Sequence, residues 1–227
     1  MSESTDFHHL YEASLGGDGV TMVPAMALAL DTHFGGLQHW RDAFTALVQA
    51  GQDGAGYALL VFRPGAGALC VLRAANPAAL VDGDLPILAL DCSAPDSVNH
   101  FLAHIDWAPV YARYAEAVQV AGEPFGAGQD AVETSACLLD VRRAGVYQQA
   151  ASVIPGAQWR DPAAVGTWAA ELPRDRAVLV YCVYGHEVGR VTALRLRAMG
   201  VDARYLQGGI DGWIAAGQPT CARPEAR

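Results

Sequence analysis

The stretch "YCVYGHEVGR", Tyr181 to Arg190, places a cysteine where an apolar run ends and a short polar loop begins. A thiol is mostly protonated at neutral pH, and it becomes a thiolate when unpaired backbone N–H groups at a helix N-terminus surround it. Gly185 permits a positive φ angle, and a helix expected from about Val188 directs its positive end back towards the sulfur. Cys182 is therefore a candidate nucleophile, and residues 183–188 are its candidate anion-binding cradle.

A buried cysteine that merely ends a strand is the alternative interpretation of Cys182.

The loop after Cys182 contains one carboxylate, and its members are Val183, Tyr184, Gly185, His186, Glu187 and Val188. Cysteine-based phosphatases clamp phosphate with an arginine six residues after the nucleophile, a position that Val188 occupies here. The nearest following arginine is Arg190. We therefore disfavour phosphatase and arsenate-reductase activity.

The composition describes a globular protein with one large or two small cores. Of the 227 residues, 52% are hydrophobic and 17% are charged. A net charge of -9 and a pI near 5.1 exclude an extended nucleic-acid or anionic-membrane surface, because such surfaces need clustered Lys and Arg. The expected partners are small molecules or other proteins.

The cysteine pattern and the N-terminal residues favour a reducing, cytoplasmic location. The five cysteines are scattered and form no CxxC pair, which disfavours a disulfide framework and a thiolate zinc site. The first residues lack the basic and apolar regions of a signal peptide, and no apolar run reaches membrane-spanning length. These cysteines are Cys70, Cys92, Cys137, Cys182 and Cys221.

A Gly- and Pro-rich stretch at residues 120–131 divides the chain, and we expect an exposed linker there. After it, at residues 132–222, apolar runs and helical patterns alternate. Such alternation predicts an α/β domain with a doubly wound parallel sheet, in which ligands bind beyond the carboxyl ends of the strands. Cys182 stands at such an end.

Residues 1–119 have a different order of elements, typical of an α+β domain. Helical spacing over residues 33–51 includes Phe34, Leu37, Phe44 and Leu47. A hairpin over residues 56–76 and a third strand over residues 85–91 predict a three-stranded antiparallel sheet. Residues 97–118 read as helical up to the linker.

Four ordered motifs across residues 130–220 resemble the rhodanese family of sulfurtransferases. They are Asp140-Val141-Arg142, Ile154 to Ala157, the loop Cys182 to Glu187, and Gly208-Gly209 with Trp213. The resemblance implies that Cys182 takes sulfane sulfur from a donor as a persulfide and passes it to a thiol or cyanide, without a cofactor. It also implies that Asp140 and Arg142 support the loop from a second layer, although Arg142 also reads as an ion-paired structural residue.

The loop departs from the family at one position that bears on the donor. Members acting on thiosulfate commonly carry Arg or Lys in the loop, whereas this loop carries Glu187. Because a carboxylate opposes the binding of a dianion, we expect a protein or low-molecular-weight persulfide as donor rather than thiosulfate. His186 is a candidate to hydrogen-bond the donor or the acceptor, or else a solvated loop histidine.

Residues 7–118 are similar to the C-terminal domain of iron and manganese superoxide dismutases. The residues that carry this resemblance are the Phe34-Gly35 start of a helix with Trp40, the segment Gly54 to Tyr57, the strand ending at Asp91, and Trp107 followed by Tyr111 and Tyr114. The resemblance implies an α+β domain built around a metal site.

That metal site is incomplete in the sequence. The family binds its metal through three His and one Asp, whereas Asp91 is followed by Cys92, Ser93, Ala94 and Pro95 in place of the family's Asp-x-Trp-x-His. His8 or His9 falls where a second ligand would lie. Two groups are too few to hold a redox metal, so we expect no metal and regard Asp91 and His8 as vestigial.

Cys92, His100 and His104 lie nearby in sequence and offer an alternative ligand set, since His100 and His104 stand at i and i+4. Surface or core histidines on a helix are the simpler interpretation. Three functions therefore stay open: a sulfurtransferase with a dismutase-like accessory domain, a redox or persulfide sensor that uses Cys182, and a residual metal-dependent dismutase. Homo-oligomerisation is left open, although the dimer contacts of intact dismutases fall partly in the segment lost here.

Overall fold

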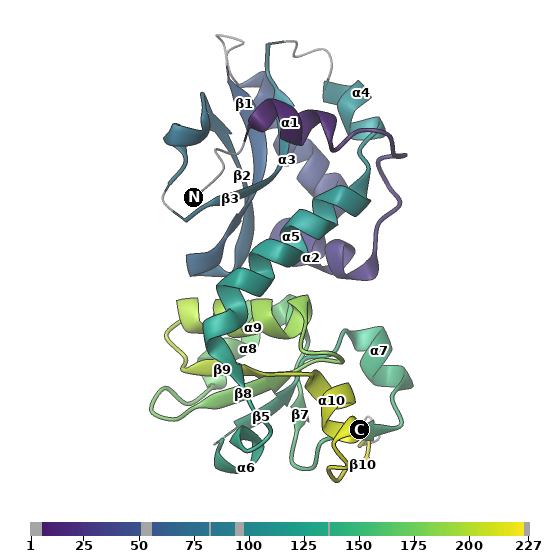
Figure 1. Cartoon of the computed structure of the whole chain (residues 1–227), viewed down its shortest axis with the longest axis vertical. Helices are drawn as coiled ribbons and strands as arrows, with labels where there is room; N and C mark the ends of the chain where they lie inside the picture. Colours follow the sequence, from purple (N-terminus) through teal and green to yellow (C-terminus); the bar gives the residue numbers. More distant parts are fainter. Residues whose placement is uncertain (1–5, 51–55, 82, 94–97, 136, 225–227) are drawn as a thin grey trace. The chain divides into compact units, whose positions relative to one another are not determined.

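The computed structural model describes residues 6–50, 56–81, 83–93, 98–135 and 137–224. The chain divides into two compact units: residues 1–64 with 68–117, and residues 118–227 with 65–67. Both units are drawn in Figure 1. Among the described residues, no helix is both long enough and apolar enough to cross a bilayer.

The first unit is built on a three-stranded antiparallel sheet of order β2-β1-β3, as its sequence predicts. The strands are β1 (Tyr57–Arg63), β2 (Ala68–Ala74) and β3 (Leu85–Asp91), and a 3-10 turn at Pro64–Ala66 closes the β1–β2 hairpin. Gly54, part of the dismutase-like segment before β1, lies outside the described residues.

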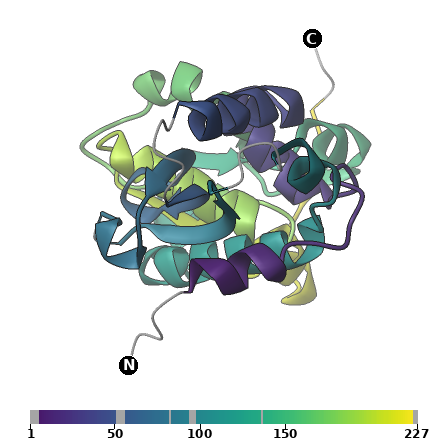
Figure 2. The ribbon, with the colours of Figure 1, turned by 90° about the horizontal axis from the view of Figure 1, so that it is seen from above.

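Helices cover both faces of this sheet, because successive side chains of a strand point to opposite faces. Phe7 and Leu10 of α1 (Phe7–Glu12) pack on the face that carries Leu59 and Val61. On the opposite face, Phe62 meets Tyr114 of α5 (Trp107–Gly122) edge to face, with ring centroids 5.7 Å apart. Figure 2 shows α1, in dark purple, along one side of the strands.

The other helices of the first unit differ in their bounds and buried residues from the helices expected from the sequence. They are α2 (Pro24–Phe34), α3 (Leu37–Gln49) and α4 (Val98–Ala103). The buried stripe of α3 is Trp40, Phe44 and Val48, whereas Leu37 and Leu47 are only half-buried. The segment expected to be helical up to the linker forms two helices, α4 and α5, and the Asp106 carboxylate accepts the Ala108 N–H at the start of α5.

The second unit contains a five-stranded parallel sheet of order β4-β9-β8-β5-β7. The strands, in chain order, are β4 (Gly126–Ala127), β5 (Cys137–Asp140), β7 (Gln158–Trp159), β8 (Val178–Tyr181) and β9 (Ala203–Leu206). A separate antiparallel pair joins β6 (Ser152–Val153) to β10 (Cys221–Ala222).

Alternate residues of the central strand β8 belong to two different cores, which makes the sheet doubly wound as predicted. Val178 and Val180 pack with α8 (Val165–Trp168) and α9 (Glu187–Ala198). Leu179 and Tyr181 pack with α10 (Gly209–Ala215). The remaining short helices are α6 (Ala131–Thr134) and α7 (Ala144–Gln149).

The segment 120–131, which we expected to be an exposed linker, is structured. It contains the end of α5, a 3-10 turn at Glu123–Phe125, the edge strand β4 and the start of α6. Gly126 and Ala127 pair with Tyr205 and Leu206 of β9. Glycine and proline enrichment marks a turn here, but backbone pairing with a strand more than seventy residues later leaves no compositional signal.

Candidate functional site

Cys182 directly follows the central strand β8, and a four-residue loop separates it from α9. Its side chain is enclosed, with 5% of the residue exposed. Backbone N–H groups of Tyr184, Gly185 and His186 in the loop, and of Gly189 in the first turn of α9, lie close enough to the sulfur to lower the pKa of the thiol. The structure thus forms an amide cradle around Cys182, which we define as these four N–H groups.

The cradle amides point inward because the carbonyls of the same segment are held from outside. Val183 shares a peptide with the Tyr184 N–H, and its carbonyl accepts the Asp211 N–H of α10 at 3.0 Å. Gly185 shares a peptide with the His186 N–H, and its carbonyl accepts Arg190 Nε at 2.9 Å. Each contact fixes the orientation of a peptide whose N–H faces the sulfur.

Two glycines permit the close approach of α10 to the loop. Gly209 has φ +58, and a Cβ there would lie 2.4 Å from the Val183 carbonyl oxygen and 2.6 Å from that of Cys182. Gly185 has φ +70, and a Cβ there would lie 2.7 Å from the Leu206 carbonyl oxygen. The Gly-Gly motif at Gly208 and Gly209 therefore positions the loop, and both residues adopt the left-handed backbone that favours glycine.

Gly189 is a site residue that the sequence interpretation missed. A Cβ at this position would lie 3.2 Å from Cys182 Sγ, tighter than ordinary contact. Because this glycine stands in the first helical turn, where its helix propensity is unfavourable, it could have been singled out as a place of close approach. Val188 lies in the first turn of α9, where its carbonyl accepts the Thr192 hydroxyl at 2.7 Å, and its part in the loop stays a prediction.

The expectation of a thiol with a lowered pKa is wrong for this enclosed state. Burial raises the pKa of the Cys182 thiol above its ordinary value of 9.0, and the four cradle amides lower it by a smaller amount. Desolvation disfavours a buried charged group, and here it outweighs the backbone dipoles. The thiol is therefore mainly protonated at neutral pH.

This direction predicts the pH dependence of the first chemical step. The attacking species is the thiolate, and a raised pKa shifts its appearance to higher pH. We expect the single-turnover rate of persulfide formation on Cys182 to keep rising from neutral pH to beyond pH 9.0. Stopped-flow measurement with a persulfide donor checks this, and a plateau reached below about pH 8 would contradict it.

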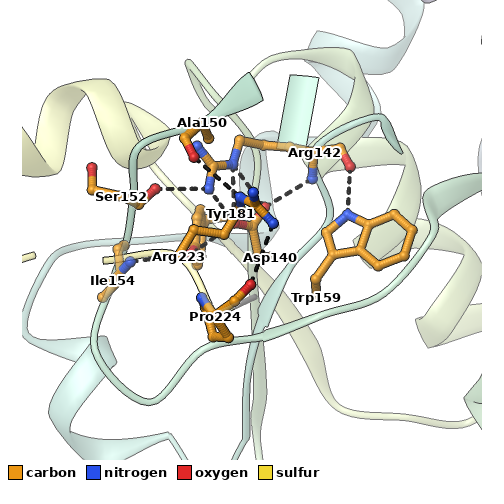
Figure 3. A network of polar contacts seen from close by, with 9 residues as sticks. All are labelled: Asp140, Arg142, Ala150, Ser152, Ile154, Trp159, Tyr181, Arg223 and Pro224. Carbon is orange, nitrogen blue, oxygen red and sulfur yellow. Dashed lines mark hydrogen bonds and ion pairs between the residues drawn. The ribbon is translucent and has the colours of Figure 1, made fainter. Parts of the chain in front are cut away.

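Asp140 and Arg142 form a buried ion pair that supports the neighbourhood of the thiol (Figure 3). The Arg142 guanidinium donates to the Asp140 carboxylate at 2.5 to 3.0 Å and to the Ser152 carbonyl at 3.0 Å. The hydroxyl of Tyr181 donates to Asp140 Oδ2 at 2.9 Å. Since Tyr181 precedes Cys182, the pair is connected to the thiol through the backbone of β8.

A second layer of contacts surrounds this ion pair. The ring of Tyr147 lies 5.7 Å from the Arg142 guanidinium and 5.5 Å from that of Arg223, and it stacks on Trp159. Arg223 also donates to the Ala150 carbonyl at 3.2 Å (Figure 3). These contacts account for Arg142 as a structural residue. Whether the pair also affects sulfur chemistry stays a prediction.

The side chains at the rim of the loop are more exposed to solvent than the Cys182 thiol. Tyr184 is 55% exposed, and its ring lies 5.7 Å from that of exposed His186. Glu187 is the first residue of α9 and is half-buried. A carboxylate in the first turn also complements the helix dipole, so Glu187 has a structural reason to be there.

The dismutase-like half does not assemble the ligand set of a redox metal from its described residues. His8 lies 3.3 Å from Glu12 in an exposed pair, and the Asp91 carboxylate accepts the Ser93 N–H at 2.8 Å. No group of three or more His, Cys, Asp or Glu that could hold a metal ion occurs among the described residues. Ala94 and Pro95 lie outside them. This donor set does not fit an iron or manganese site.

The alternative ligand set does not come together either. The rings of His100 and His104 stack 4.2 Å apart, and His104 Nδ1 lies 2.7 Å from the His100 carbonyl. Both histidines are exposed, whereas Cys92 is buried with its thiol directed at the Leu90 carbonyl. The i, i+4 spacing is confirmed as a histidine pair, and the described residues add no third ligand to it.

Comparisons with known proteins agree with this division. Residues 125–216 match the rhodanese-like domain, and residues 22–113 match the C-terminal domain of iron/manganese superoxide dismutases. The chain therefore combines a rhodanese-like domain with a dismutase C-terminal-like domain.

One curated relative and two solved structures resemble parts of the chain. An iron superoxide dismutase of Cupriavidus metallidurans is 32% identical over 129 residues, which are 52% of this chain and 65% of that enzyme. The chain thus spans less than two thirds of that relative's length. A full-length protein from Lactobacillus plantarum is 22% identical, with a TM-score of 0.42, over 49% of this chain and 98% of that one. A rhodanese-related protein from Thermoplasma volcanium is also 22% identical, with a TM-score of 0.35, over 40% and 88%.

Proposed function

We propose that the protein is a sulfurtransferase in which Cys182 carries sulfane sulfur as a persulfide. The observation that supports this most is the amide cradle, which offers hydrogen-bond donors to an anion on the Cys182 sulfur. The rhodanese-like domain supports the same class of reaction.

The first step transfers sulfur from donor to enzyme. The Cys182 thiolate attacks the outer sulfur of a donor persulfide, so that an S–S bond forms to Cys182 while the donor's own S–S bond breaks. The electron pair of the broken bond leaves on the donor thiolate. The outer sulfur keeps its proton during the transfer, so Cys182 becomes a persulfide and the donor is released as a thiolate.

The second step regenerates the enzyme. An acceptor thiolate or cyanide attacks the outer sulfur of the Cys182 persulfide, and the bond between the two sulfurs breaks. The electron pair returns to Cys182, where the cradle amides stabilise the departing thiolate. No net oxidation occurs, and no cofactor takes part in the cycle.

A redox sensor is the alternative use of the same thiol. Sensor cysteines combine a lowered pKa with solvent access. Cys182 is enclosed and the pKa of its thiol is raised, and both features oppose ready oxidation by peroxide. Incubation with a persulfide donor, thiosulfate or peroxide distinguishes the sulfurtransferase from the sensor. Repeated transfer of sulfur to cyanide supports the enzyme, whereas stable oxidation of Cys182 without turnover supports the sensor.

Glu187→Arg is expected to improve thiosulfate as a donor. The substitution replaces a carboxylate at the loop by a cation that can pair with the dianion. We expect the KM for thiosulfate to fall about 10-fold, with a smaller change in kcat. Steady-state rates with cyanide as acceptor measure both. An unchanged or higher KM would show that Glu187 does not face the donor.

We further propose that the dismutase-like half is an accessory domain without redox metal. Purified protein is expected to contain far less than one iron or manganese per chain and to show no superoxide dismutation above background. Metal analysis after growth with added iron or manganese, together with a superoxide assay, checks this. Near-stoichiometric metal with dismutase activity would contradict it.

A further inference from the structure

The rim of the persulfide loop presents one carboxylate and two aromatic faces. Glu187 has no hydrogen-bond or ion-pair partner among the described residues, although it is half-buried. Tyr184 and His186 expose their rings beside one another. A carboxylate and an aromatic face both attract cations, and the attraction strengthens where water is partly excluded.

Two arginines that contact the end of β8 or the loop are engaged elsewhere. Arg142 is bound to Asp140 and to the Ser152 carbonyl. Arg190 donates to the Gly185 carbonyl, and its guanidinium lies 5.1 Å from the ring centre of Tyr205. Arg143 is the N-cap residue of α7, and its side chain makes no capping hydrogen bond there. A substitution of Arg143 therefore has to test whether its positive charge affects binding of the acceptor.

The charge of the chain is divided very unevenly between its halves. Residues 1–117 contain four Arg and thirteen Asp or Glu, whereas residues 118–227 contain eleven Arg and eleven Asp or Glu. The whole net charge of -9 therefore belongs to the dismutase-like half. An acidic domain joined covalently to a reactive site raises the local concentration of a basic protein and speeds its association.

We propose that the sulfur acceptor is a protein whose acceptor cysteine is flanked by Lys or Arg. This inference rests on the sulfurtransferase function proposed above. The acceptor thiolate attacks the outer sulfur of the Cys182 persulfide, a new S–S bond forms on the acceptor, and the electron pair of the broken bond returns to Cys182. Glu187 and the ring of Tyr184 bind the flanking cations during this attack, and the net negative charge of the chain attracts a basic protein.

Three pentapeptides with a central cysteine flanked by Lys, Ser or Glu test the proposal. The full chain is loaded as the Cys182 persulfide, and the second-order rate constant of transfer to each peptide is measured at about 20 mM and about 500 mM salt. Lysines also raise the reactivity of the peptide thiol itself. We therefore compare the ratio of the rate constants for the Lys and Ser peptides between enzyme variants, because the intrinsic reactivity of each peptide is the same for every variant and cancels. The variants are Glu187→Gln, Arg143→Gln and, as a control with the same charge change, Asp175→Asn at an exposed site.

We expect the preference for the Lys peptide over the Ser peptide to fall about 5- to 10-fold in Glu187→Gln and to stay unchanged in Asp175→Asn. Arg143→Gln is expected to keep or increase the preference. High salt should reduce the wild-type rate with the Lys peptide at least about threefold, with little effect on the Ser peptide.

An equal preference in wild type and Glu187→Gln would overturn the proposal, as would a preference that disappears in Arg143→Gln. Faster transfer to cysteamine than to the Lys peptide would overturn the assignment to a protein acceptor. If no thiol receives sulfur while cyanide does, the acceptor proposal fails and the sulfurtransferase function stands. If Cys182 takes up no sulfur at all, the proposed function fails first.

Discussion

Replacing Cys182 by serine is expected to lower turnover from a persulfide donor to cyanide by about 1,000-fold or more. The hydroxyl is nearly isosteric with the thiol but cannot hold sulfane sulfur, so the step on which both half-reactions depend is lost. The fold should be unaffected, because the substitution keeps the size of a side chain that is enclosed at the end of β8. The rate of thiocyanate formation measures the loss.

Cys221→Ser is the matched control for this substitution. Cys221 is an exposed free cysteine on β10, in the same unit. Its replacement should leave the rate within about twofold of wild type. A Cys182→Ser protein that keeps the wild-type rate, or an equal loss in both variants, would refute the assignment of Cys182.

Gly209→Ala is expected to have the second largest effect, because it separates α10 from the persulfide loop. The new Cβ would approach the carbonyl oxygens of Val183 and Cys182 to 2.4 and 2.6 Å, and the residue would keep a left-handed φ of +58. Backbone on both sides of the contact has to move, which disturbs the carbonyl anchors that direct the cradle amides inward. We expect a loss of about 2–4 kcal/mol in the free energy of unfolding and a fall of about 100-fold in persulfide formation.

Gly217→Ala separates the backbone strain from the clash. Gly217 has a similar φ of +72 in the same unit, but a Cβ there would meet nothing within 4 Å. This control should cost about 1–2 kcal/mol and leave the rate of persulfide formation near wild type. Denaturant unfolding and single-turnover rates distinguish the two variants. Equal rate losses in both would mean that the approach of α10 does not position the loop.

The parts of the fold that depend on local patterning were predictable from the sequence. The β1–β2 hairpin and the parallel strands β8 and β9 follow from apolar runs bounded by turn residues, and Cys182 was recognisable at a strand end. The helix boundary at Asp106 was missed, although an aspartate two residues before an N–H donor is a typical capping signal. The strand β4 was missed because its two residues are defined only by their partner β9.

The place of Cys182 between a strand and a helix was predictable from the sequence, whereas the electrostatics around its thiol were not. The loop sequence indicated a thiol near amides, and the structure adds Gly189 and the carbonyl anchors from Asp211 and Arg190. The anchor from α10 joins residues that are more than twenty positions apart, so no local pattern contains it. Whether the pKa of the Cys182 thiol is raised or lowered depends on the balance between burial and the four cradle amides, and only the three-dimensional packing determines that balance.

The most direct test of a sulfur-carrying Cys182 is the mass of the intact protein after incubation with a low-molecular-weight persulfide and removal of the excess donor. We expect a gain of one sulfur atom, located by peptide mapping on Cys182, which disappears when cyanide is added and thiocyanate forms in equal amount. Wild-type protein that gains no sulfur on Cys182, or that keeps the added sulfur in the presence of cyanide, would contradict it.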